Sequence, residues 1–303
     1  EIGSGLVGSE MCIRDRGMPI TGLYFWANNQ TLVQRVLSAR SLNEGRKGVM
    51  LNGAITLSTL LLFAIPGVMC RQLFPGLERP DMVYPAMILN LMPVGLLGLM
   101  LAVLFAALTS TLGAIMNATS TLFTMDFYRK FDPRASDRRL VRVGKIVSLI
   151  VVVIAALWAP QIGRFDSLLK YYQEILSYLA PPVVAAFLLG VFSRRVNGQG
   201  VFAGLVAGLV VAVLMMLFRT AIFGDMHFLF IVPILFLFSL LLMVVVSLLT
   251  APPADDRLRG NLFSAAAFRK ECIALRRKAW WNNYLLWGVV LLIAGGALLL
   301  LFS

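Results

Sequence analysis

The chain has 303 residues, of which 59% are hydrophobic and 14% are charged, and its mean hydropathy is +0.84. A soluble domain carries about 25% charged residues, so this composition excludes a water-soluble fold. The formal net charge is +12, but the basic residues cluster in short segments between apolar runs, which argues against a nucleic-acid partner, and three scattered cysteines exclude a disulfide framework or a metal cluster.

Residues 1–16 differ from everything that follows. They show no apolar periodicity, no hydrophobic region of a signal peptide and no cleavage site of small residues. Their sequence resembles translated sequencing-adapter read-through, and we interpret them as a non-native leader. An ordinary extracellular loop is the alternative. On the first interpretation the native reading frame starts near Gly17.

Apolar segments that could cross a bilayer recur along the rest of the chain. About 20 apolar residues span the ~30 Å hydrocarbon core as a helix. Residues 19–40 are helical in pattern but too polar for a complete lipid-facing span. Residues 82–92 are too short to cross and are predicted to form a helix on the membrane surface. Full spans are predicted for residues 49–70, 95–128, 139–158, 171–192, 201–217, 228–249 and 284–302.

The basic residues give these spans a direction. With Arg40 on the cytoplasmic side, the inner connections carry about four times as many lysines and arginines as the outer ones. The sequence therefore predicts an all-α, multi-pass integral membrane protein of the cell membrane, plasma or inner. Its partner is the lipid bilayer, and the charge needs no nucleic acid to explain it.

Polar residues at the middle of a span are candidates for function, because an unsatisfied polar group at that depth is costly. Ser110 and Thr111 follow Ala107 by three and four residues, so two hydroxyls and a carbonyl lie on one side of the helix. Three neutral oxygens suit a hard monovalent cation such as Na⁺. From the residues alone, hydroxyls that bond back to their own helix or pack against small residues are the favoured interpretation.

Two further segments are polar or interrupted. An aromatic triplet, residues 24–26, precedes Asn28, Asn29 and Gln30, which is typical both of a broken helix beside a polar solute and of a helix end in the interfacial belt. Gln173 and Glu174 precede Pro181 and Pro182 in the predicted span at residues 171–192. These prolines remove backbone donors and favour a kink or an unwound section, although a solvated entrance would also explain the polar pair.

No phosphate loop, no nucleophile with its base and no metal-ligand cluster occurs in the sequence, so we do not expect an enzyme. The polar segments together resemble the solute:sodium symporter family, particularly its sodium/sugar cotransporter branch. The resemblance covers about residues 24–193. It rests on NQTLVQR (29–35) with Lys47 and Gly48, on NATSTLFTMDFY (117–128), and on residues 173–174, 180–182 and 187–192.

This resemblance implies the C-terminal part of a leucine-transporter-like fold, which has two five-helix inverted repeats around a site at mid-membrane. The expected organisation is a second inverted repeat at 17–192, additional transmembrane helices at 193–250, a basic cytoplasmic linker at 251–280 and a final transmembrane helix at 281–303. The first repeat is expected to precede this chain. Residues 1–303 alone are therefore expected not to transport.

The resemblance also assigns roles to residues. Ala107, Ser110 and Thr111 fall on the sodium-site positions of the family, which makes Na⁺ the expected coupling ion and reverses the preference above. Phe25 falls at an inner aromatic gate, and Gln173 falls where sugar-transporting members bond sugar hydroxyls. Gly22 and Thr56 replace an Asn and a Lys of sugar-binding relatives, which weighs against hexose and leaves a smaller polyol or an inositol open.

The expected function is sodium-coupled symport of a small organic solute, such as a sugar, an inositol or another polyol. The alternative is a symporter-like membrane sensory module of a signalling protein, which a signalling domain beyond Ser303 would favour. A purely structural anchor gives no reason for polar residues at mid-membrane.

Overall fold

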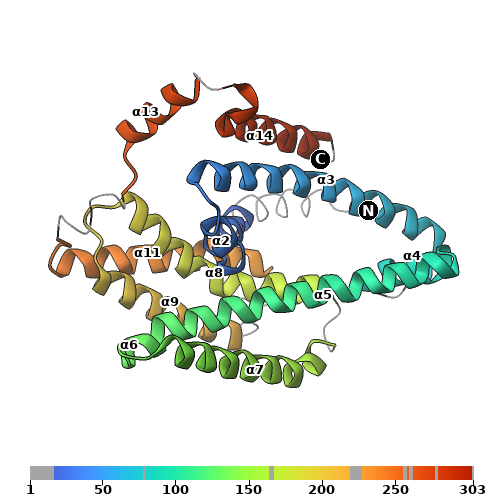
Figure 1. Ribbon diagram of the computed structural model, residues 1–303, viewed down its shortest axis with the longest axis horizontal. Helices are drawn as coiled ribbons and strands as arrows, with labels where there is room; N and C mark the ends of the chain where they lie inside the picture. Colours follow the sequence, from blue (N-terminus) through green and yellow to red (C-terminus); the bar gives the residue numbers. More distant parts are fainter. Residues whose placement is uncertain are drawn as a thin grey trace. The chain divides into compact units, whose positions relative to one another are not determined.

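The computed structural model describes residues 17–77, 79–163, 167–218, 227–254, 258, 262–276 and 279–301. In these residues all regular secondary structure is helical, as predicted (Figure 1). Six helices are long and apolar enough to cross a membrane, and a shorter apolar helix covers Tyr284–Leu298. The prediction of an all-α membrane protein is confirmed. The interpretation of residues 1–16 lies outside the described residues.

The chain divides into two compact units. The first unit comprises Glu1–Asn29 and Leu169–Lys278, and the second comprises Gln30–Leu168 and Ala279–Ser303. The first unit contains a helix at residues 17–23, the π-helical turn η1 (Tyr24–Asn28), α8 (Leu168–Phe192), α9 (Gly198–Leu217), η4 (Phe228–Phe230), α11 (Ile231–Leu249) and α13 (Ala265–Arg276).

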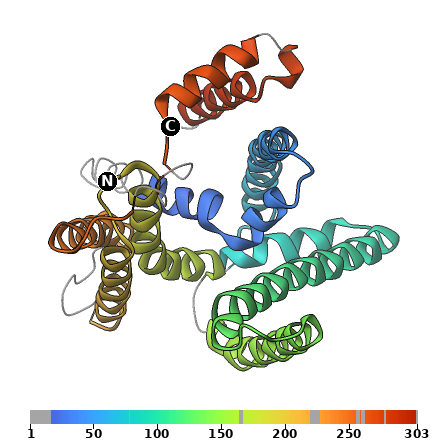
Figure 2. The same ribbon diagram turned by 60° about the vertical axis from the view of Figure 1, so that its left-hand side comes forward.

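Small residues bring α9 and α11 close together, and the two helices lie side by side in Figures 1 and 2. Small side chains let helix backbones approach in a membrane, where the hydrophobic effect does not drive association. A Cβ added to the first of these small residues, Gly200, would lie 2.7 Å from the Met243 carbonyl oxygen of α11. The buried stripe of α9 repeats every four residues and consists of Gly200, Gly204, Gly208 and Ala212.

Helix α8 runs without interruption through Pro181 and Pro182, and both prolines are fully buried. Of the kink or unwound section predicted there, the unwound section is therefore wrong. A Cβ at Gly208 of α9 would lie 3.0 Å from Cβ and Cγ of Pro182, so the ring packs where α9 has no side chain. This packing offsets the low helix propensity of proline.

The helix at residues 17–23 is held against the start of the α11 segment. A Cβ at Gly17 would lie 2.7 Å from the Leu229 carbonyl oxygen, so only glycine allows this approach. Ile20 packs on the buried side chains of Phe228, Leu229 and Val232. These contacts fix the helix that leads into η1.

The second unit contains the longest spans. Its elements are α2 (Gln30–Leu37), α3 (Leu42–Leu73), η2 (Pro80–Met82), α4 (Val83–Leu91), α5 (Val94–Leu122), η3 (Phe123–Tyr128), α6 (Arg129–Phe131), α7 (Asp137–Ile162), η5 (Trp280–Asn282) and α14 (Tyr284–Leu301). Ser41 caps α3, because its Oγ accepts a hydrogen bond of 3.3 Å from the amide of Glu44. The short helix predicted at residues 82–92 is confirmed as α4.

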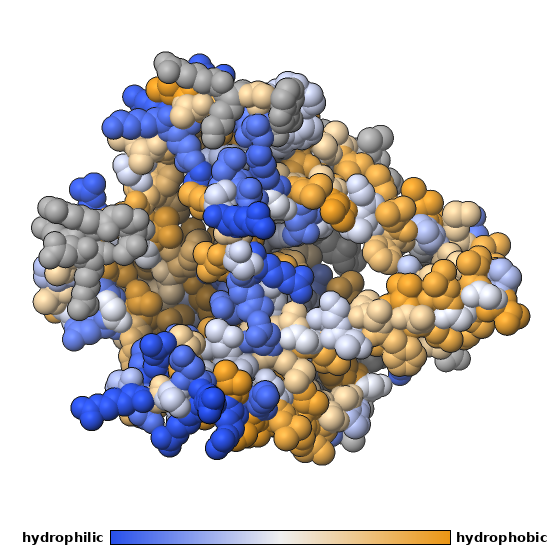
Figure 3. All heavy atoms as spheres, in the orientation of Figure 1, coloured by the Kyte–Doolittle hydropathy of each residue, from blue (hydrophilic) through white to orange (hydrophobic). Residues whose placement is uncertain are grey.

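Helices α5 and α7 form an antiparallel pair (Figures 1 and 2). Gly144 of α7 lies opposite the hydroxyl groups of Ser120 and Thr124, and Ser148 Oγ donates to the Met116 carbonyl at 3.4 Å. In Figure 3, hydrophobic side chains cover the end of α4 and α5, while hydrophilic side chains gather over α6 and the first turns of α7. A helix pair that crosses a bilayer requires this separation.

Candidate functional site

The segment at residues 24–30 contains a break in the helix. The π-helical turn η1 ends at Asn28, Asn29 is extended with φ −72° and ψ 113°, and α2 begins at Gln30. The helix is thus broken at this segment, and a polar solute beside the break stays a prediction. Within a membrane such a break is tolerated only where the backbone is buried in protein or lines a cavity, and π-helical turns are frequent at functional sites.

A side-chain donor is available at this break. The amide nitrogen Nδ2 of Asn28 is buried and has no hydrogen-bond partner among the residues that the structure describes. A buried donor without a partner costs about 1–3 kcal/mol, so a ligand or water that satisfies it would be favoured.

The two residues expected to contact the solute line one cavity. Phe25 from η1 and Gln173 from α8 both face a cavity of about 210 Å³ in the first unit. Gly22 lines the same cavity. Ligand pockets for drug-sized molecules measure about 300–1,000 Å³, so this cavity fits a small solute. Its other lining residues are Met18, Thr21, Trp26, Tyr172, Leu176, Ser177 and Leu229.

Most hydroxyl groups around this cavity are satisfied by their own helix, whereas the Gln173 amide is not. Thr21 Oγ1 donates to the Met18 carbonyl at 3.0 Å, and the buried Ser177 Oγ donates to the Gln173 carbonyl at 2.7 Å. Among the described residues, no hydrogen bond occupies the side-chain amide of Gln173. This amide offers both donors and an acceptor to a ligand.

Aromatic rings complete the lining. The rings of Phe25 and Trp26 meet edge to face, with centroids 5.4 Å apart and an interplanar angle of 86°. The cavity thus combines aromatic faces, which can cover the C–H faces of a solute, with a free amide that can bond its hydroxyls. This combination suits a small neutral polyol.

Of the two departures from sugar-binding relatives, Gly22 lines the cavity of the first unit, and Thr56 belongs to the second unit. A Cβ at Gly22 would meet no atom within 4 Å, so a side chain there has room to extend. Thr56 lies exposed on α3 in the second unit, and its Oγ1 donates to the Asn52 carbonyl at 2.9 Å.

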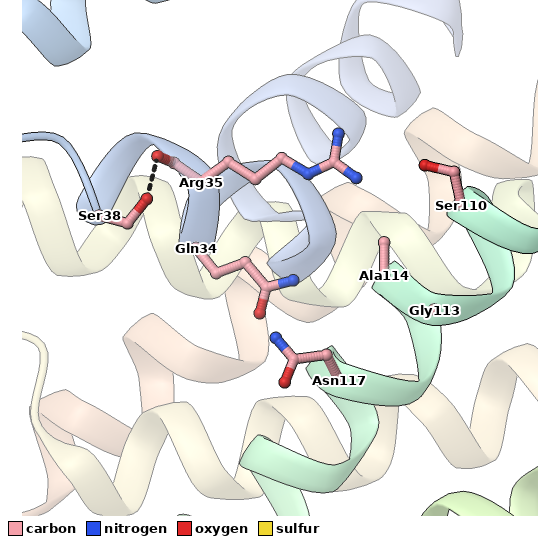
Figure 4. Close-up of a pocket in the computed structure, with 7 residues that line it drawn as sticks. All are labelled: Gln34, Arg35, Ser38, Ser110, Gly113, Ala114 and Asn117. Atoms are coloured by element: carbon pink, nitrogen blue, oxygen red, sulfur yellow. Dashed lines mark hydrogen bonds between the residues drawn. The ribbon is translucent and has the colours of Figure 1, made fainter. Parts of the chain in front are cut away.

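The three predicted sodium ligands lie exposed on α5. Thr111 Oγ1 donates to the Ala107 carbonyl at 2.9 Å, which is the back-bonding that the residues alone favoured. Ser110 instead lines a cavity between α2 and α5 of the second unit (Figure 4). The described structure thus pairs Ala107 with Thr111, and Ser110 faces a different set of side chains.

Several lining residues were not selected from the sequence. Thr21 lies four residues from Phe25, and helical spacing would have found it. Ser177 follows Gln173 by four residues and carries the same signal. Leu229 carries no local signal, because it reaches the cavity only through the packing of η4 against residues 17–23.

Comparison with known proteins agrees with the motifs. Residues 15–208 match the Sodium:solute symporter family. Sodium/glucose cotransporter 4 of Mus musculus is 36% identical over 275 residues, which cover 80% of this chain and 40% of that protein. Sodium/myo-inositol cotransporter 2 of Sus scrofa is 35% identical over 273 residues, covering 79% and 40%. A sodium/mannose cotransporter of Bos taurus is 38% identical over 270 residues, covering 78% and 45%.

The chain spans about two fifths of the length of these curated relatives. The family match, however, covers well over half of the chain itself, and it includes η1, α5 and α8, which carry the candidate residues. The chain belongs to the sodium:solute symporter family.

Proposed function

We propose that the protein containing this chain is a sodium-coupled symporter of a small neutral polyol, such as a sugar or an inositol. The observation that carries the proposal is the cavity where Phe25 and Gln173 converge beside a broken helix. The relatives named above carry glucose, myo-inositol and mannose in their names, and all three are polyhydroxylated and uncharged.

Each residue of the cavity has a role in this proposal. The Gln173 amide bonds two solute hydroxyls, one as donor and one as acceptor. The rings of Phe25 and Trp26 cover an apolar face of the solute, and Phe25 closes the site on its inner side. A net hydrogen bond contributes about 0.5–1.5 kcal/mol, so the loss of the amide weakens binding roughly 2- to 13-fold for each bond.

Sodium would be held by the Ala107 carbonyl and by the hydroxyls of Ser110 and Thr111. A hydroxyl carries two lone pairs besides its proton, so Thr111 Oγ1 can coordinate a cation while it donates to the Ala107 carbonyl, as it does in the structure. The two oxygens then face the ion together. Further oxygens would come from the rest of the full-length protein.

Coupling follows from linkage between the two sites. If Na⁺ raises the affinity for the solute, the solute must raise the affinity for Na⁺ by the same factor. The Na⁺ gradient then drives solute accumulation, because the state that binds both is favoured where Na⁺ is abundant.

The test is uptake of radiolabelled glucose, mannose and myo-inositol by cells that express the full-length protein containing this chain. Gln173→Ala should raise the half-saturation concentration of the transported solute, while Gln161→Ala, an exposed amide on α7, should not. An unchanged half-saturation concentration in Gln173→Ala would remove the cavity from the proposal.

The sodium site has a separate test. Replacing Ser110 by Ala together with Thr111 by Val should raise the Na⁺ concentration that half-activates uptake. Thr119→Val is the matched control, because Thr119 Oγ1 also bonds back to α5, at the Ile115 carbonyl (2.9 Å), outside the predicted site. Uptake that persists without Na⁺ in the unaltered protein refutes symport itself.

A further inference from the structure

A second cavity, of about 350 Å³, lies between α2 and α5 of the second unit (Figure 4). It shares no lining residue with the cavity of Phe25 and Gln173. Helix α2 contributes Gln34, Arg35 and Ser38, and α5 contributes Ser110 and Asn117 with the small residues between them. The sequence analysis singled out Ser110 alone of these for chemistry.

The α5 side of the cavity is one face of a transmembrane helix. Ser110, Gly113, Ala114 and Asn117 follow one another at helical spacings of three and four residues. They lie in the middle of an apolar span that runs from Val94 to Phe131. At 1.5 Å per residue, Asn117 lies about 18 Å along the helix from Arg129, well inside the hydrocarbon depth. An amide at this depth requires water, a protein partner or a ligand.

The polar groups of the cavity keep their hydrogen-bonding capacity. In Figure 4 the amides of Gln34 and Asn117 point toward one another, and the guanidinium of Arg35 extends toward Ser110. Within the part of the chain that the structure describes, no hydrogen bond uses these amides or this guanidinium. The Ser38 hydroxyl donates to the Arg35 carbonyl at 2.8 Å. Donors and acceptors are thus available from two helices.

The chemistry of the lining selects the ligand. No carboxylate lines the cavity and one guanidinium does, which disfavours a cation inside it. Of the three proposed sodium ligands only Ser110 lines the cavity, and Ala107 and Thr111 do not. Two amides supply acceptors as well as donors, which an anion would leave unused and a polyol would satisfy. No aromatic ring is present among the lining residues, so binding rests on hydrogen bonds alone and is weaker than in the aromatic cavity of Phe25.

We propose that this cavity is a second, weaker site for the polyhydroxylated solute, near the cytoplasmic end of α2. Gln34, Arg35 and Asn117 bind the solute hydroxyls there. The location follows from the excess of basic residues that assigns the end of α2 to the cytoplasm. The choice of solute rests on the proposed function, and the weaker binding lets the solute leave.

Filling the cavity is the first test. A Cβ at Gly113 would meet no described atom within 4 Å, so Gly113→Leu adds its side chain at the cavity without a backbone clash at Cβ. Gly98→Leu is the matched control, because Gly98 lies on the same helix, is equally open and is outside the cavity. In cells expressing the full-length protein, Gly113→Leu should lower the maximal rate of myo-inositol uptake severalfold at equal surface expression. The external half-saturation concentration should not change, and Gly98→Leu should behave like the unaltered protein.

Removing single amides is the second test. Asn117→Ala and Gln34→Ala should each raise the half-saturation concentration for myo-inositol on the cytoplasmic side, measured in inside-out vesicles, by roughly 2- to 13-fold. The external value should stay constant. Asn90→Ala, on α4, removes an amide that bonds its own helix and serves as the control. Equal shifts on both sides, or none on either, would overturn the proposal.

Equilibrium binding to the purified full-length protein separates this proposal from the proposed function. We expect myo-inositol to show two classes of site, of which Asn117→Ala removes the weaker. A single class that Asn117→Ala leaves unchanged overturns the second site but not symport. Two classes in a protein whose uptake ignores Na⁺ contradict symport and support the second site. The binding measurement is repeated with chloride in place of gluconate as the buffer anion. If chloride abolishes the weaker class of myo-inositol binding, the cavity is an anion site and the assignment to a polyol is overturned.

Discussion

Adding one methyl group to the interface of α9 and α11 tests how closely these helices pack. In Gly200→Ala the new Cβ would lie 2.7 Å from the Met243 carbonyl oxygen and 3.0 Å from the Ser247 amide nitrogen. Both are backbone atoms, so they cannot rotate away as a side chain could. The helices must separate to accept the methyl group.

The size of the effect follows from two opposing terms. Overpacking of this kind costs about 1–3 kcal/mol, while replacing Gly by Ala in a helix gains up to about 1 kcal/mol. At Gly198, on the same helix, a Cβ would meet nothing within 4 Å, so Gly198→Ala carries no overpacking cost. We therefore expect Gly200→Ala to be less stable than Gly198→Ala by about 1–3 kcal/mol.

The assay is heating of the detergent-solubilised full-length protein, followed by size-exclusion chromatography of the monodisperse fraction. Each kcal/mol corresponds to roughly 2–4 °C for a domain of 150–250 residues. Gly200→Ala should lose its monodisperse peak several degrees below Gly198→Ala. If Gly200→Ala survives to the same temperature or higher, the close approach of α9 and α11 is incorrect.

Three further predictions concern other parts of the chain. Gly22→Asn places an amide in open space at the solute cavity. It should lower the half-saturation concentration for hexose uptake roughly 2- to 13-fold. Gly190→Asn is the control, because Gly190 is equally open but lies outside the cavity, and it should have no effect. The Asp81 carboxylate caps α8, because it accepts a hydrogen bond of 2.7 Å from the Leu168 amide. Asp81→Ala should therefore lower the free energy of unfolding by about 1 kcal/mol in the same heating assay. A melting temperature equal to that of the unaltered protein would contradict this role of Asp81. Asp132→Asn should change stability by less than about 1 kcal/mol, because its partner Arg139, 3.2 Å away, is 62% exposed; a loss of many degrees would show that the pair matters more than exposed pairs do.

The spans could be predicted because the bilayer imposes a local rule on length and polarity. The span expected at 95–128, for example, corresponds to α5 and η3 at Val94–Tyr128 almost residue for residue. The proline pair of α8 shows the limit of local rules. The prolines predicted a kink or an unwound section. The helix stays continuous where Pro182 packs against Gly208 of α9, and this contact cannot be predicted from the sequence of α8 alone.

The candidate site shows the same limit. Phe25 and Gln173 were selected through the family resemblance, and their presence in one cavity needed the packing of the first unit. The second cavity was missed because the sequence does not show that α2 lies beside this face of α5. Asn117 belongs to one of the family motifs. Its place opposite Gln34, on a different helix, became visible only in the structure.

The break at Asn29 leaves two helix ends that can attract a polar ligand without a charged side chain. A helix end carries a partial charge, positive at free amides and negative at free carbonyls, of about half an elementary charge. Residues 24–30 contain no carboxylate, histidine, lysine or arginine. The electric field at this segment therefore comes from backbone dipoles, which do not titrate. Its attraction for a polar ligand should stay constant across the physiological pH range, so any pH dependence of uptake must arise from residues elsewhere in the protein.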